Sequence, residues 1–418
     1  MKKLLSALLA LLATATFLSA CNFNNFLPQN QTTDSSNSQG GDEMQKLDLT
    51  SLSKNIDEIA QYDISNHKVF GSAYYVYQDG IEFEKCYGTT SLDSNTPISN
   101  TSLFRLASMT KPITAIATLI LAERGQLSLD DSIDTYLPAF KNVDIIDTSY
   151  NKTAPLHAPT IRNILTHTSG IGSNPDKLTA MTANDKKTLD ASVAFFAKNG
   201  LDFEPGSMQQ YSGTGSFDVL TKIIETVSEK DYLSFLQTEI FEPCGMTDTT
   251  FVPNAEQQAR MVVMHDRANG ENTIYKMPAG CIFEDYPSTH YLGGAGLVST
   301  LSDYGKFAKM LLNKGKTDNG TILKEHVFKQ LCTAQVSKEI MPGNARWGLG
   351  VRVITEDSYP YLPKGSFGWS GAYGSHFWID PVNKIFAVYM KNSKVDGGAG
   401  NESAVKFEQA VYSSFAKE

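Results

Sequence analysis

The chain contains 418 residues, of which 41% are hydrophobic, 10% aromatic and 19% charged, and its formal net charge is −9 at pH 7. This length allows two or three structural units with packed cores, and the aromatic content excludes a wholly disordered chain. An acidic chain without a basic block is a poor ligand for nucleic acid, so we expect no nucleic-acid partner.

The first twenty residues have the pattern of a secretory signal. Two lysines precede a mostly apolar, uncharged run over residues 4–20, which is marginal in length for crossing a bilayer. The run ends in LSAC (residues 18–21), which resembles a bacterial lipobox whose cysteine becomes the acylated N-terminus. We therefore predict a signal peptide over residues 1–20, lipidation at Cys21 and an exported protein anchored on the outer side of a bacterial membrane. The alternative is an ordinary cleaved signal that ends beside a cysteine.

Residues 21–46 are rich in Asn, Gln, Ser, Thr and Gly and show neither helical nor strand periodicity. This composition is typical of a flexible tether between the anchor and the folded body. No later segment reaches the ~18 uninterrupted apolar residues of a spanning helix, so we expect the body itself to be soluble.

The folded body begins with a helix over about residues 47–63, where apolar residues recur at near-helical spacing. Two runs rich in aromatic and β-branched residues then flank Asp79-Gly80, which predicts a β-hairpin over residues 71–88. Residues 112–124 are apolar almost all round and Gly125 follows them. This pattern predicts a helix that is buried on most sides and capped by glycine.

The rest of the body continues with helices and then returns to strands. Helical periodicity covers residues 217–227 and, further on, residues 304–311. Residues 375–379 and 385–389 form two strand-like runs around a turn of about five residues, which predicts a second hairpin. A last helix is expected over residues 404–415.

Strands near both ends with helices between them favour one antiparallel sheet built from both ends of the chain. Terminal helices would cover this sheet, and a mainly helical lobe would interrupt it. We therefore predict an α/β (α+β) fold, with a sheet domain formed by residues 47–107 and 286–418 and a mainly helical domain over residues 108–285.

Four cysteines remain after Cys21, at positions 86, 244, 281 and 332. They lack the short paired spacings of a zinc site. In an exported protein they could form disulfides, and buried free thiols fit equally well. The sequence leaves Cys86, Cys244, Cys281 and Cys332 open between these two states.

A serine and a lysine stand three residues apart where the buried helix begins, at Ser108 and Lys111. Residues at this spacing on a helix share a face, so the amine can point at the hydroxyl. A serine becomes a nucleophile when a base takes its proton, and a dry environment disfavours the charged form of a lysine and makes it a better base. Ser51 and Lys54 have the same spacing without a buried helix behind them, and we interpret them as a solvated helix face. The spacing by itself therefore also fits an ordinary helix start.

The segment FRLASMTKP (residues 104–112) strongly resembles the first motif of the serine β-lactamase and penicillin-recognising family. The resemblance is greatest to its class C-like branch, which also holds D,D-peptidases and carboxylesterases. Further segments resemble that branch in the expected order: GQLSLDDS (125–132), IRNILTHTSG (161–170), FEPGSMQQYSG (203–213), FEPCGMTDT (241–249), GGAGLVST (293–300) and GWSGAYG (368–374). The resemblance covers about residues 50–415. It implies the β-lactamase/transpeptidase-like fold and a catalytic serine at position 108, without a metal or organic cofactor.

The second motif of this family is Tyr-x-Asn, and here it is Tyr211-Ser212-Gly213. A phenol near an ammonium group has its anion favoured, so Tyr211 is the candidate general base and acid together with Lys111. Gly213 stands where the family has asparagine, and it offers no side chain to bind a substrate amide or to steady Lys111.

The third motif is normally Lys-Thr-Gly or His-x-Gly on an edge strand, and here it is Trp369-Ser370-Gly371. The resemblance implies that small residues such as Gly371 let substrate lie close to the strand, and that the backbone N–H groups of Ser108 and Ala372 form the oxyanion hole. The cation that receives a substrate carboxylate is replaced by Trp369, which offers an aromatic surface and one indole donor. Trp-x-Gly at this point is similar to the esterase members of the family.

Other chemical interpretations are weaker. Ser370 lies in a near match to the G-x-S-x-G elbow, but the match ends in alanine and precedes a strand instead of a helix. We expect His167 to fix its turn by hydrogen bonds and His376 to pack on a strand near the site, with substrate contact as the alternative for His376. Trp347 and Trp378 are expected in the core. No metal-binding spacing and no phosphate-binding loop occurs in the sequence.

These motifs predict a serine hydrolase that acts through an acyl-enzyme, with carboxylic esters as the favoured small-molecule substrates. The loss of the asparagine and of the cation should weaken the recognition of amides and carboxylates. The alternative function keeps the same site and acts on cell-wall peptides or β-lactams. A second alternative is a surface binding protein with this fold and little catalysis. The sequence does not indicate the oligomeric state.

Overall fold

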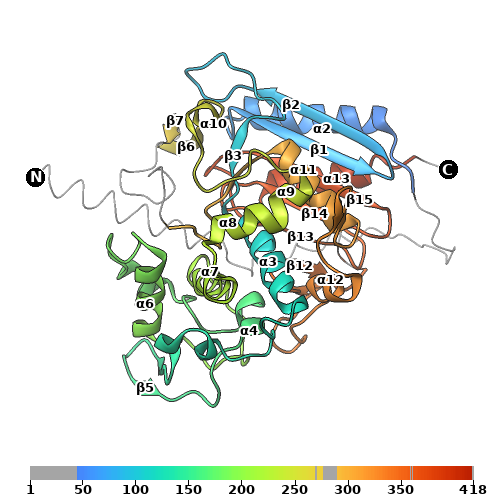
Figure 1. The fold of residues 1–418 in the computed structure, drawn as a ribbon. Coiled ribbons are helices and arrows are strands. Elements are labelled where there is room, and N and C mark those ends of the chain that lie inside the picture. Colours follow the sequence, from blue (N-terminus) through green and yellow to red (C-terminus); the bar gives the residue numbers. More distant parts are fainter. Residues whose placement is uncertain (1–44, 269–270, 276–289, 358, 360, 417–418) are drawn as a thin grey trace, which may run out of the picture.

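The computed structural model describes residues 45–268, 271–275, 290–357, 359 and 361–416 (Figure 1). The predicted signal peptide, the predicted lipidation site at Cys21, nearly all of the predicted tether and Cys281 lie outside these residues. Over the described part of the chain, no helix combines the length and the apolar character that a membrane span requires.

A seven-stranded antiparallel sheet forms the centre of the fold, in the strand order β11-β12-β13-β14-β15-β1-β2. The strand β1 near the N-terminus lies next to β15 near the C-terminus, with Tyr75 opposite Val388. The prediction that both ends of the chain build one antiparallel sheet is therefore confirmed. The strands are β1 Gly71–Gln78, β2 Ile81–Gly88, β11 Ala345–Trp347, β12 Arg352–Ile354, β13 Phe367–Ser370, β14 His376–Asp380 and β15 Ile385–Met390.

Both predicted hairpins are present. Gln78 pairs with Ile81, which leaves Asp79-Gly80 as a two-residue turn with both φ angles positive, at 46° and 93°. This left-handed pair matches the right-handed twist of the strands, which explains the strength of the Asp-Gly signal. In the second hairpin, Asp380 pairs with Ile385 across a turn that the Asp380 carboxylate fixes by accepting two backbone N–H groups.

Terminal helices cover one face of the sheet. The helices α2 Leu49–Ser65 and α13 Glu402–Tyr412 pack together there, and the apolar residues of α2 recur at the spacing that predicted it. They bury Tyr74, Trp378 and Tyr389 from the sheet, and the rings of Tyr74 and Tyr389 stack with centroids 4.7 Å apart. The opposite face packs on α11 Leu301–Leu312, whose predicted helix is also confirmed. The sheet thus has one apolar core on each side.

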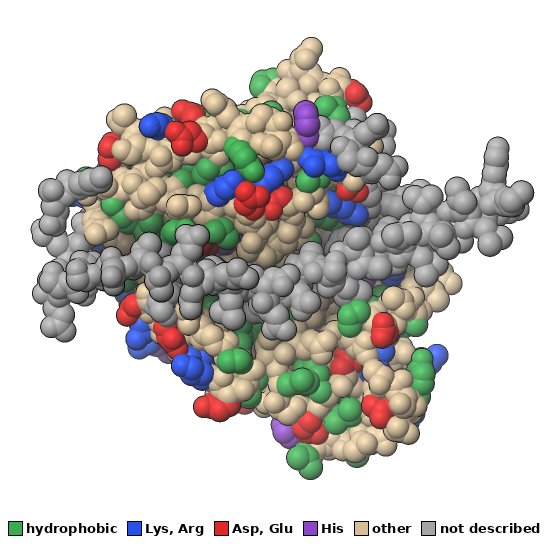
Figure 2. Space-filling model, turned by 180° about the vertical axis from the view of Figure 1, so that it is seen from behind, with side chains coloured by type: hydrophobic (Ala, Val, Ile, Leu, Met, Phe, Trp, Pro, Cys, Tyr) green, Lys and Arg blue, Asp and Glu red, His purple; other side chains and the backbone are tan. Residues whose placement is uncertain are grey.

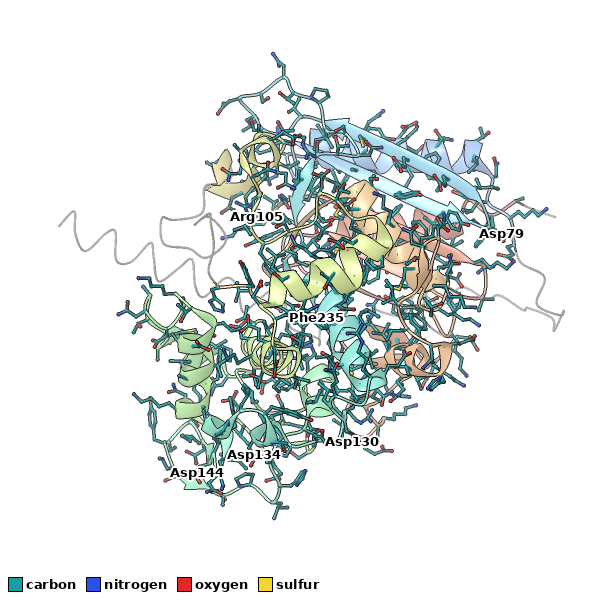
Figure 3. All side chains as sticks on the ribbon, viewed as in Figure 1. Asp79, Arg105, Asp130, Asp134, Asp144 and Phe235 are labelled. Carbon is teal, nitrogen blue, oxygen red and sulfur yellow. The ribbon has the colours of Figure 1, made fainter. Side chains whose placement is uncertain are left out.

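The helical lobe is inserted between β3 Leu103–Arg105 and β8 Val298–Thr300, which pair with each other where the chain leaves and re-enters the sheet domain. Figure 3 shows Phe235 of this lobe among the interior side chains, and its side chain is buried. The predicted residue boundaries of the two domains stay a prediction. The chain between β3 and β8 contains η2 Ala107–Thr110, α3 Lys111–Glu123, η3 Ile133–Thr135, η4 Pro138–Phe140, β4 Ile145–Ile146, β5 Lys152–Thr153, α4 Ile161–Leu165, α5 Pro175–Thr179, α6 Leu189–Asn199, α7 Gly215–Ser228, α8 Tyr232–Leu236, η5 Gln237–Phe241, α9 Glu242–Cys244, α10 Ala255–Ala259, β6 Met264–Ala268 and β7 Glu271–Tyr275. Of these, β6 lies against the sheet domain, where the His265 N–H donates to the Asn392 carbonyl. The remaining elements, β9 Lys316–Thr317, β10 Gly320–Thr321 and α12 Glu325–Leu331, follow α11.

The helix α3 runs through the middle of the molecule (Figure 1). Every residue from Lys111 to Leu121 is buried, as its all-round apolar sequence predicted. Pro112 lies in its first turn, and Gly125 adopts a left-handed φ of 67° just after its end. This buried helix begins with Lys111, the lysine that the sequence predicts for the active site.

The described cysteines Cys86, Cys244 and Cys332 carry free thiols. Burial raises the pKa of the Cys86 thiol to about 11 and that of the Cys244 thiol to about 12, so neither is a ready thiolate. On the face seen in Figure 2, acidic and basic side chains lie interspersed.

A buried ion pair ties His290 to helix α7. His290 Nε2 lies 3.0 Å from Asp218 Oδ2, Ser192 donates to the same carboxylate oxygen, and His290 Nδ1 contacts the Lys186 carbonyl. Burial disfavours the imidazolium, but attraction to Asp218 and these hydrogen bonds outweigh it and raise the pKa of His290 above its ordinary 6.5. A group with a raised pKa stabilises the fold below its unfolded-state pKa, and this contribution is lost as the pH rises through the folded value.

We therefore expect Asp218→Asn to lower the free energy of unfolding by about 2 kcal/mol at pH 6, and by clearly less at pH 9. Urea denaturation at the two pH values measures the difference. As a control, Asp218→Asn in a His290→Gln background should cause a loss that does not vary between these pH values. A destabilisation that grows with pH would contradict this account of the pair.

Candidate active site

The structure brings Ser108, Lys111 and Tyr211 together, although position 211 is 103 residues away from position 108. The Tyr211 hydroxyl donates to Ser108 Oγ over 2.7 Å, and Lys111 Nζ donates to the same oxygen over 3.3 Å. The serine hydroxyl is therefore within hydrogen-bond reach of two groups that can exchange a proton with it.

Ser108 lies on η2, one short turn before α3. The preceding residue, Ala107, has a φ of 46°, which is a sparsely populated conformation for a residue with a side chain. The turn is closed by the Met109 N–H, which donates to the Leu106 carbonyl over 3.1 Å. Ser108 retains 8% exposure. The candidate nucleophile thus follows a residue in a strained backbone conformation and is itself nearly buried.

Lys111 has no exposed surface and is held by backbone carbonyls. Its Nζ donates to the Gly213 carbonyl over 2.5 Å and to the Gly294 carbonyl over 2.8 Å. The sequence correctly indicated that Gly213 has no side chain to steady Lys111, but the backbone oxygen of the same residue does so instead. Together with Ser108 Oγ, the two carbonyls account for three donors of the amine.

Gly294 is a site residue that the sequence reasoning missed. A Cβ atom at this position would lie 3.0 Å from the Gly213 carbonyl oxygen and 3.3 Å from Lys111 Nζ, so the close approach of the backbone favours glycine. The glycine-rich segment 293–300 was the signal that could have identified it.

Tyr211 is enclosed by aromatic side chains. Trp369 Nε1 donates to the Tyr211 hydroxyl oxygen over 3.3 Å, and the two rings lie 5.5 Å apart between centroids. The Trp347 ring stacks on Tyr211 at 6.0 Å, and Lys111 Nζ lies 4.9 Å from the centre of the phenol ring. Trp369 is 3% exposed, so nearly all of its surface is covered by neighbouring residues. Its contact with substrate stays a prediction.

The segment after β13 lies beside the serine. A Cβ atom on Gly371 would lie 2.5 Å from the Leu106 carbonyl oxygen, and Ala372 packs in one cluster with Ala107. The backbone N–H groups of Ser108 and Ala372 belong to the two segments that meet here, and their use as an oxyanion hole stays a prediction.

The other singled-out residues have structural contacts. Ser370 ends a strand as expected, and its hydroxyl lies 2.8 Å from His376 Nδ1, while His376 Nε2 lies 2.9 Å from Glu408. These three buried groups join β13 and β14 to α13, so the expected packing of His376 is confirmed. Trp347 and Trp378 are fully buried, as predicted.

His167 differs from expectation. Its backbone N–H does close its own turn onto Ile164, but its imidazole reaches a different segment, where Nδ1 accepts from the Ser212 N–H over 3.2 Å. A contact between positions 45 apart leaves no local sequence signal.

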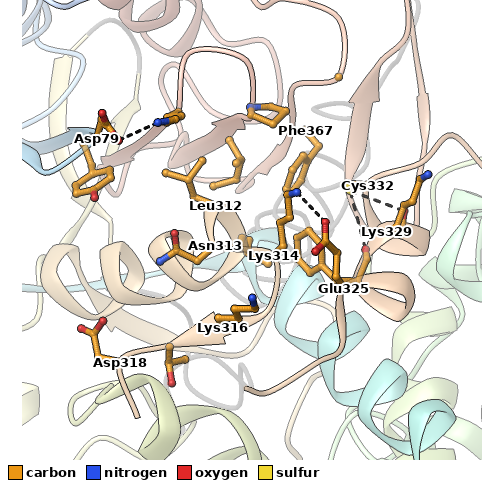
Figure 4. Close-up of a pocket in the computed structure, with 18 residues that line it drawn as sticks. Asp79, Leu312, Asn313, Lys314, Lys316, Asp318, Glu325, Lys329, Cys332 and Phe367 are labelled. Atoms are coloured by element: carbon orange, nitrogen blue, oxygen red, sulfur yellow. Dashed lines mark hydrogen bonds and ion pairs between the residues drawn. The ribbon is translucent and has the colours of Figure 1, made fainter. Parts of the chain in front are cut away.

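A cavity of about 890 Å³ lies elsewhere, between one end of the sheet and the helices α11 and α12 (Figure 4). Apolar residues such as Leu312 and Phe367 line it, and the ion pair between Lys314 and Glu325 spans part of it. None of the three converging residues lines this cavity. Among the residues that the structure describes, no cluster of three or more His, Cys, Asp or Glu side chains is placed to hold a metal ion.

The chain is similar to known proteins over most of its length. The chain is 30% identical over 353 residues to an uncharacterized protein of Mycobacterium tuberculosis, covering 77% of this chain and 87% of that protein. It is 27% identical over 396 residues to esterase EstB of Burkholderia gladioli, covering 88% and 96% of the two chains. The solved structure of EstCE1, described as a hydrolase with promiscuous acyltransferase activity, superposes with a TM-score of 0.75 at 22% identity and covers 87% of this chain and 99% of its own.

The match of the Beta-lactamase family model to residues 52–409, together with the likeness to EstCE1, confirms the predicted β-lactamase/transpeptidase-like fold. The model of the family described as Beta-lactamase matches residues 52–409, which include both strands of the first hairpin, the whole helical lobe and most of the last helix. Because this match spans almost the entire folded body, the chain belongs to the Beta-lactamase family.

Proposed function

We propose that the protein hydrolyses carboxylic esters through an acyl-enzyme on Ser108. The observation that carries this proposal is the hydrogen bonding of one serine oxygen to both a phenol and a buried amine, at 2.7 Å and 3.3 Å. A serine in such a position can lose its proton at the moment of attack. The similarity to esterase EstB over 88% of this chain supports the choice of substrate class.

The reaction has two halves. In the first, Ser108 Oγ bonds to the ester carbonyl carbon while its proton passes to the deprotonated member of the Tyr211–Lys111 pair. The same proton then goes to the departing oxygen, so that an alcohol leaves and an acyl-serine remains. In the second half, water adds to the acyl carbon through the same pair, the carboxylic acid departs and the serine regains its proton. The amides of Ser108 and Ala372 stabilise the oxyanion in both halves.

Two departures from the family motifs, at Trp369 and Gly213, favour neutral esters over β-lactams and peptides as substrates. The indole of Trp369 stands where the family motif carries a cation, and it offers no charge to a substrate carboxylate because it is neutral. Its N–H already donates to the Tyr211 hydroxyl oxygen. Gly213 offers no side-chain amide, and its carbonyl is occupied by Lys111. Hydrolysis of β-lactams or cell-wall peptides is the alternative, and binding without catalysis is the second alternative.

A comparison of three reagents tests the proposal. The purified protein is incubated with a fluorophosphonate probe, a short-chain p-nitrophenyl ester and a chromogenic cephalosporin. We expect labelling and ester turnover, with little cephalosporin turnover, and we expect Ser108→Ala to abolish the first two. Ser51→Ala is the matched control, because Ser51 and Lys54 share the spacing of Ser108 and Lys111 but lie on α2 with Lys54 exposed.

Each other outcome has a clear meaning. Efficient cephalosporin turnover would replace the ester proposal with the β-lactam alternative. A complete lack of labelling and turnover by the wild-type protein would contradict catalysis and favour the binding protein.

A further inference from the structure

His167 forms hydrogen bonds to the residues on both sides of Tyr211, the candidate proton-transfer residue. Its backbone carbonyl accepts from the Gln210 N–H over 3.0 Å, and its Nδ1 accepts from the Ser212 N–H over 3.2 Å. These two hydrogen bonds bracket Tyr211, so the backbone on each side of the tyrosine is fixed by one residue. The turn that contains His167 is already closed by its own backbone N–H, which donates to the Ile164 carbonyl. The bond from Ser212 to Nδ1 therefore serves the Tyr211 segment and not this turn.

The imidazole ring also packs against the side chain that it brackets. Its centroid lies 4.5 Å from that of Tyr211 and 4.5 Å from that of Trp347. With 1% exposure, the residue is enclosed by its neighbours. Contacts to the Tyr211 ring and to the backbone N–H groups of Gln210 and Ser212 on either side restrict the phenol.

We propose that His167 is a positioning residue for proton transfer, whose neutral imidazole holds the Ser212 amide and thereby keeps the Tyr211 hydroxyl on Ser108. The inference rests on the proposed function. It also reaches Lys111, because the next residue in the held segment is Gly213, whose carbonyl accepts from the Lys111 amine. One residue thus fixes the segment that carries Tyr211 and the Gly213 carbonyl, which accepts from Lys111.

The electrostatics of the ring agree with this arrangement. Nδ1 can accept a hydrogen bond only while it carries no proton, so the ring proton lies on Nε2. Burial and the nearby charge of Lys111 lower the pKa of His167 well below its ordinary value, and the acceptor is therefore maintained at neutral pH. Nε2 is buried and has no hydrogen-bond partner among the described residues. An apolar ring would fill the same space without this cost, so the distinctive contribution of the imidazole is the acceptor at Nδ1.

The chain offers a matched pair of variants. In His167→Asn, the side-chain oxygen takes the place of Nδ1, and asparagine tolerates the left-handed φ of 56° at this position. In His167→Phe, a ring of similar size remains but the acceptor is lost. We expect His167→Phe to lower kcat for a p-nitrophenyl ester by about 10- to 100-fold with KM changed less than about threefold, because a displaced catalytic group loses rate without losing substrate contacts. His167→Asn should retain kcat within about fivefold of the wild type.

A double-mutant cycle separates positioning from general damage. If His167 acts through Tyr211, the loss caused by His167→Phe should shrink to less than about threefold in a Tyr211→Phe background. Thermal unfolding of each variant verifies that it is folded. If His167→Phe does not fold, His167→Gln replaces it, since glutamine places its oxygen near Nε2 and not near Nδ1.

The results distinguish this inference from the proposed function. Equal losses in His167→Asn and His167→Phe, an undiminished loss in the Tyr211→Phe background, or no loss at all would overturn the positioning role while wild-type turnover upheld the function. A wild-type protein without turnover or fluorophosphonate labelling would overturn both.

Discussion

In a Tyr211→Phe variant, kcat for a p-nitrophenyl ester is expected to fall by about 10²- to 10⁴-fold, the range that a positioned acid–base group contributes. The substitution removes the oxygen that donates to Ser108 over 2.7 Å and keeps the ring that packs against Trp347 and Trp369. Substrate contacts should therefore survive, so KM should change little. Steady-state kinetics with a series of leaving groups measures the loss, which should be largest for poor leaving groups that need protonation.

Tyr412→Phe is the matched control for this prediction. The Tyr412 hydroxyl also donates to another side chain, Asp380, over 2.7 Å, but it lies on α13 on the far side of the sheet. We expect Tyr412→Phe to leave kcat unchanged. If Tyr211→Phe retained more than about one tenth of the wild-type kcat, Tyr211 would not be the acid–base group.

The elements that position the site could be predicted because their signals are local. Asp79-Gly80 has the left-handed conformation that its residue types favour, and α3 is buried because its sequence is apolar on all sides. The spacing of Ser108 and Lys111 needed only the geometry of one helical turn. For each of these features, the residues that specify the structure lie within about a dozen positions of one another.

The support of the site could not be predicted in the same way. The acceptors for Lys111 are the carbonyls of Gly213 and Gly294, and a backbone carbonyl is the same in every residue type. A missing asparagine side chain therefore suggested a weakened site, whereas the fold supplies the oxygen from the main chain. Long-range packing decided the contact, and no local pattern reports such packing.

Trp369 illustrates a related difficulty. From the sequence, an indole at the third motif is a platform or a donor for substrate. In the structure, its N–H points at the Tyr211 oxygen, so the group that replaces the family cation contacts the candidate base. Residue type indicated a donor at this place, but only the three-dimensional arrangement identifies its partner.

In a Lys111→Met variant, kcat/KM for the p-nitrophenyl ester is expected to fall by about 10³-fold or more. The amine contacts the serine directly and also holds the Gly213 carbonyl, so its loss removes a partner in proton transfer and a support of the second motif. Methionine matches the length of the lysine stem and suits a site without exposed surface. Lys111→Arg should not rescue activity, because the guanidinium is planar, larger and always protonated.

Burst kinetics identifies the step in which the amine acts. If Lys111 takes part in proton transfer in both halves of the reaction, the burst of p-nitrophenol and the steady-state rate should both fall in Lys111→Met. A normal burst followed by a slow steady state would restrict the amine to deacylation. Lys54→Met is the matched control, since Lys54 is the lysine of the second Ser-x-x-Lys pair and its side chain is 77% exposed. Unchanged kinetics in Lys54→Met and full activity in Lys111→Met would together contradict the assignment, because a buried amine 3.3 Å from the nucleophile would then have no part in its activation.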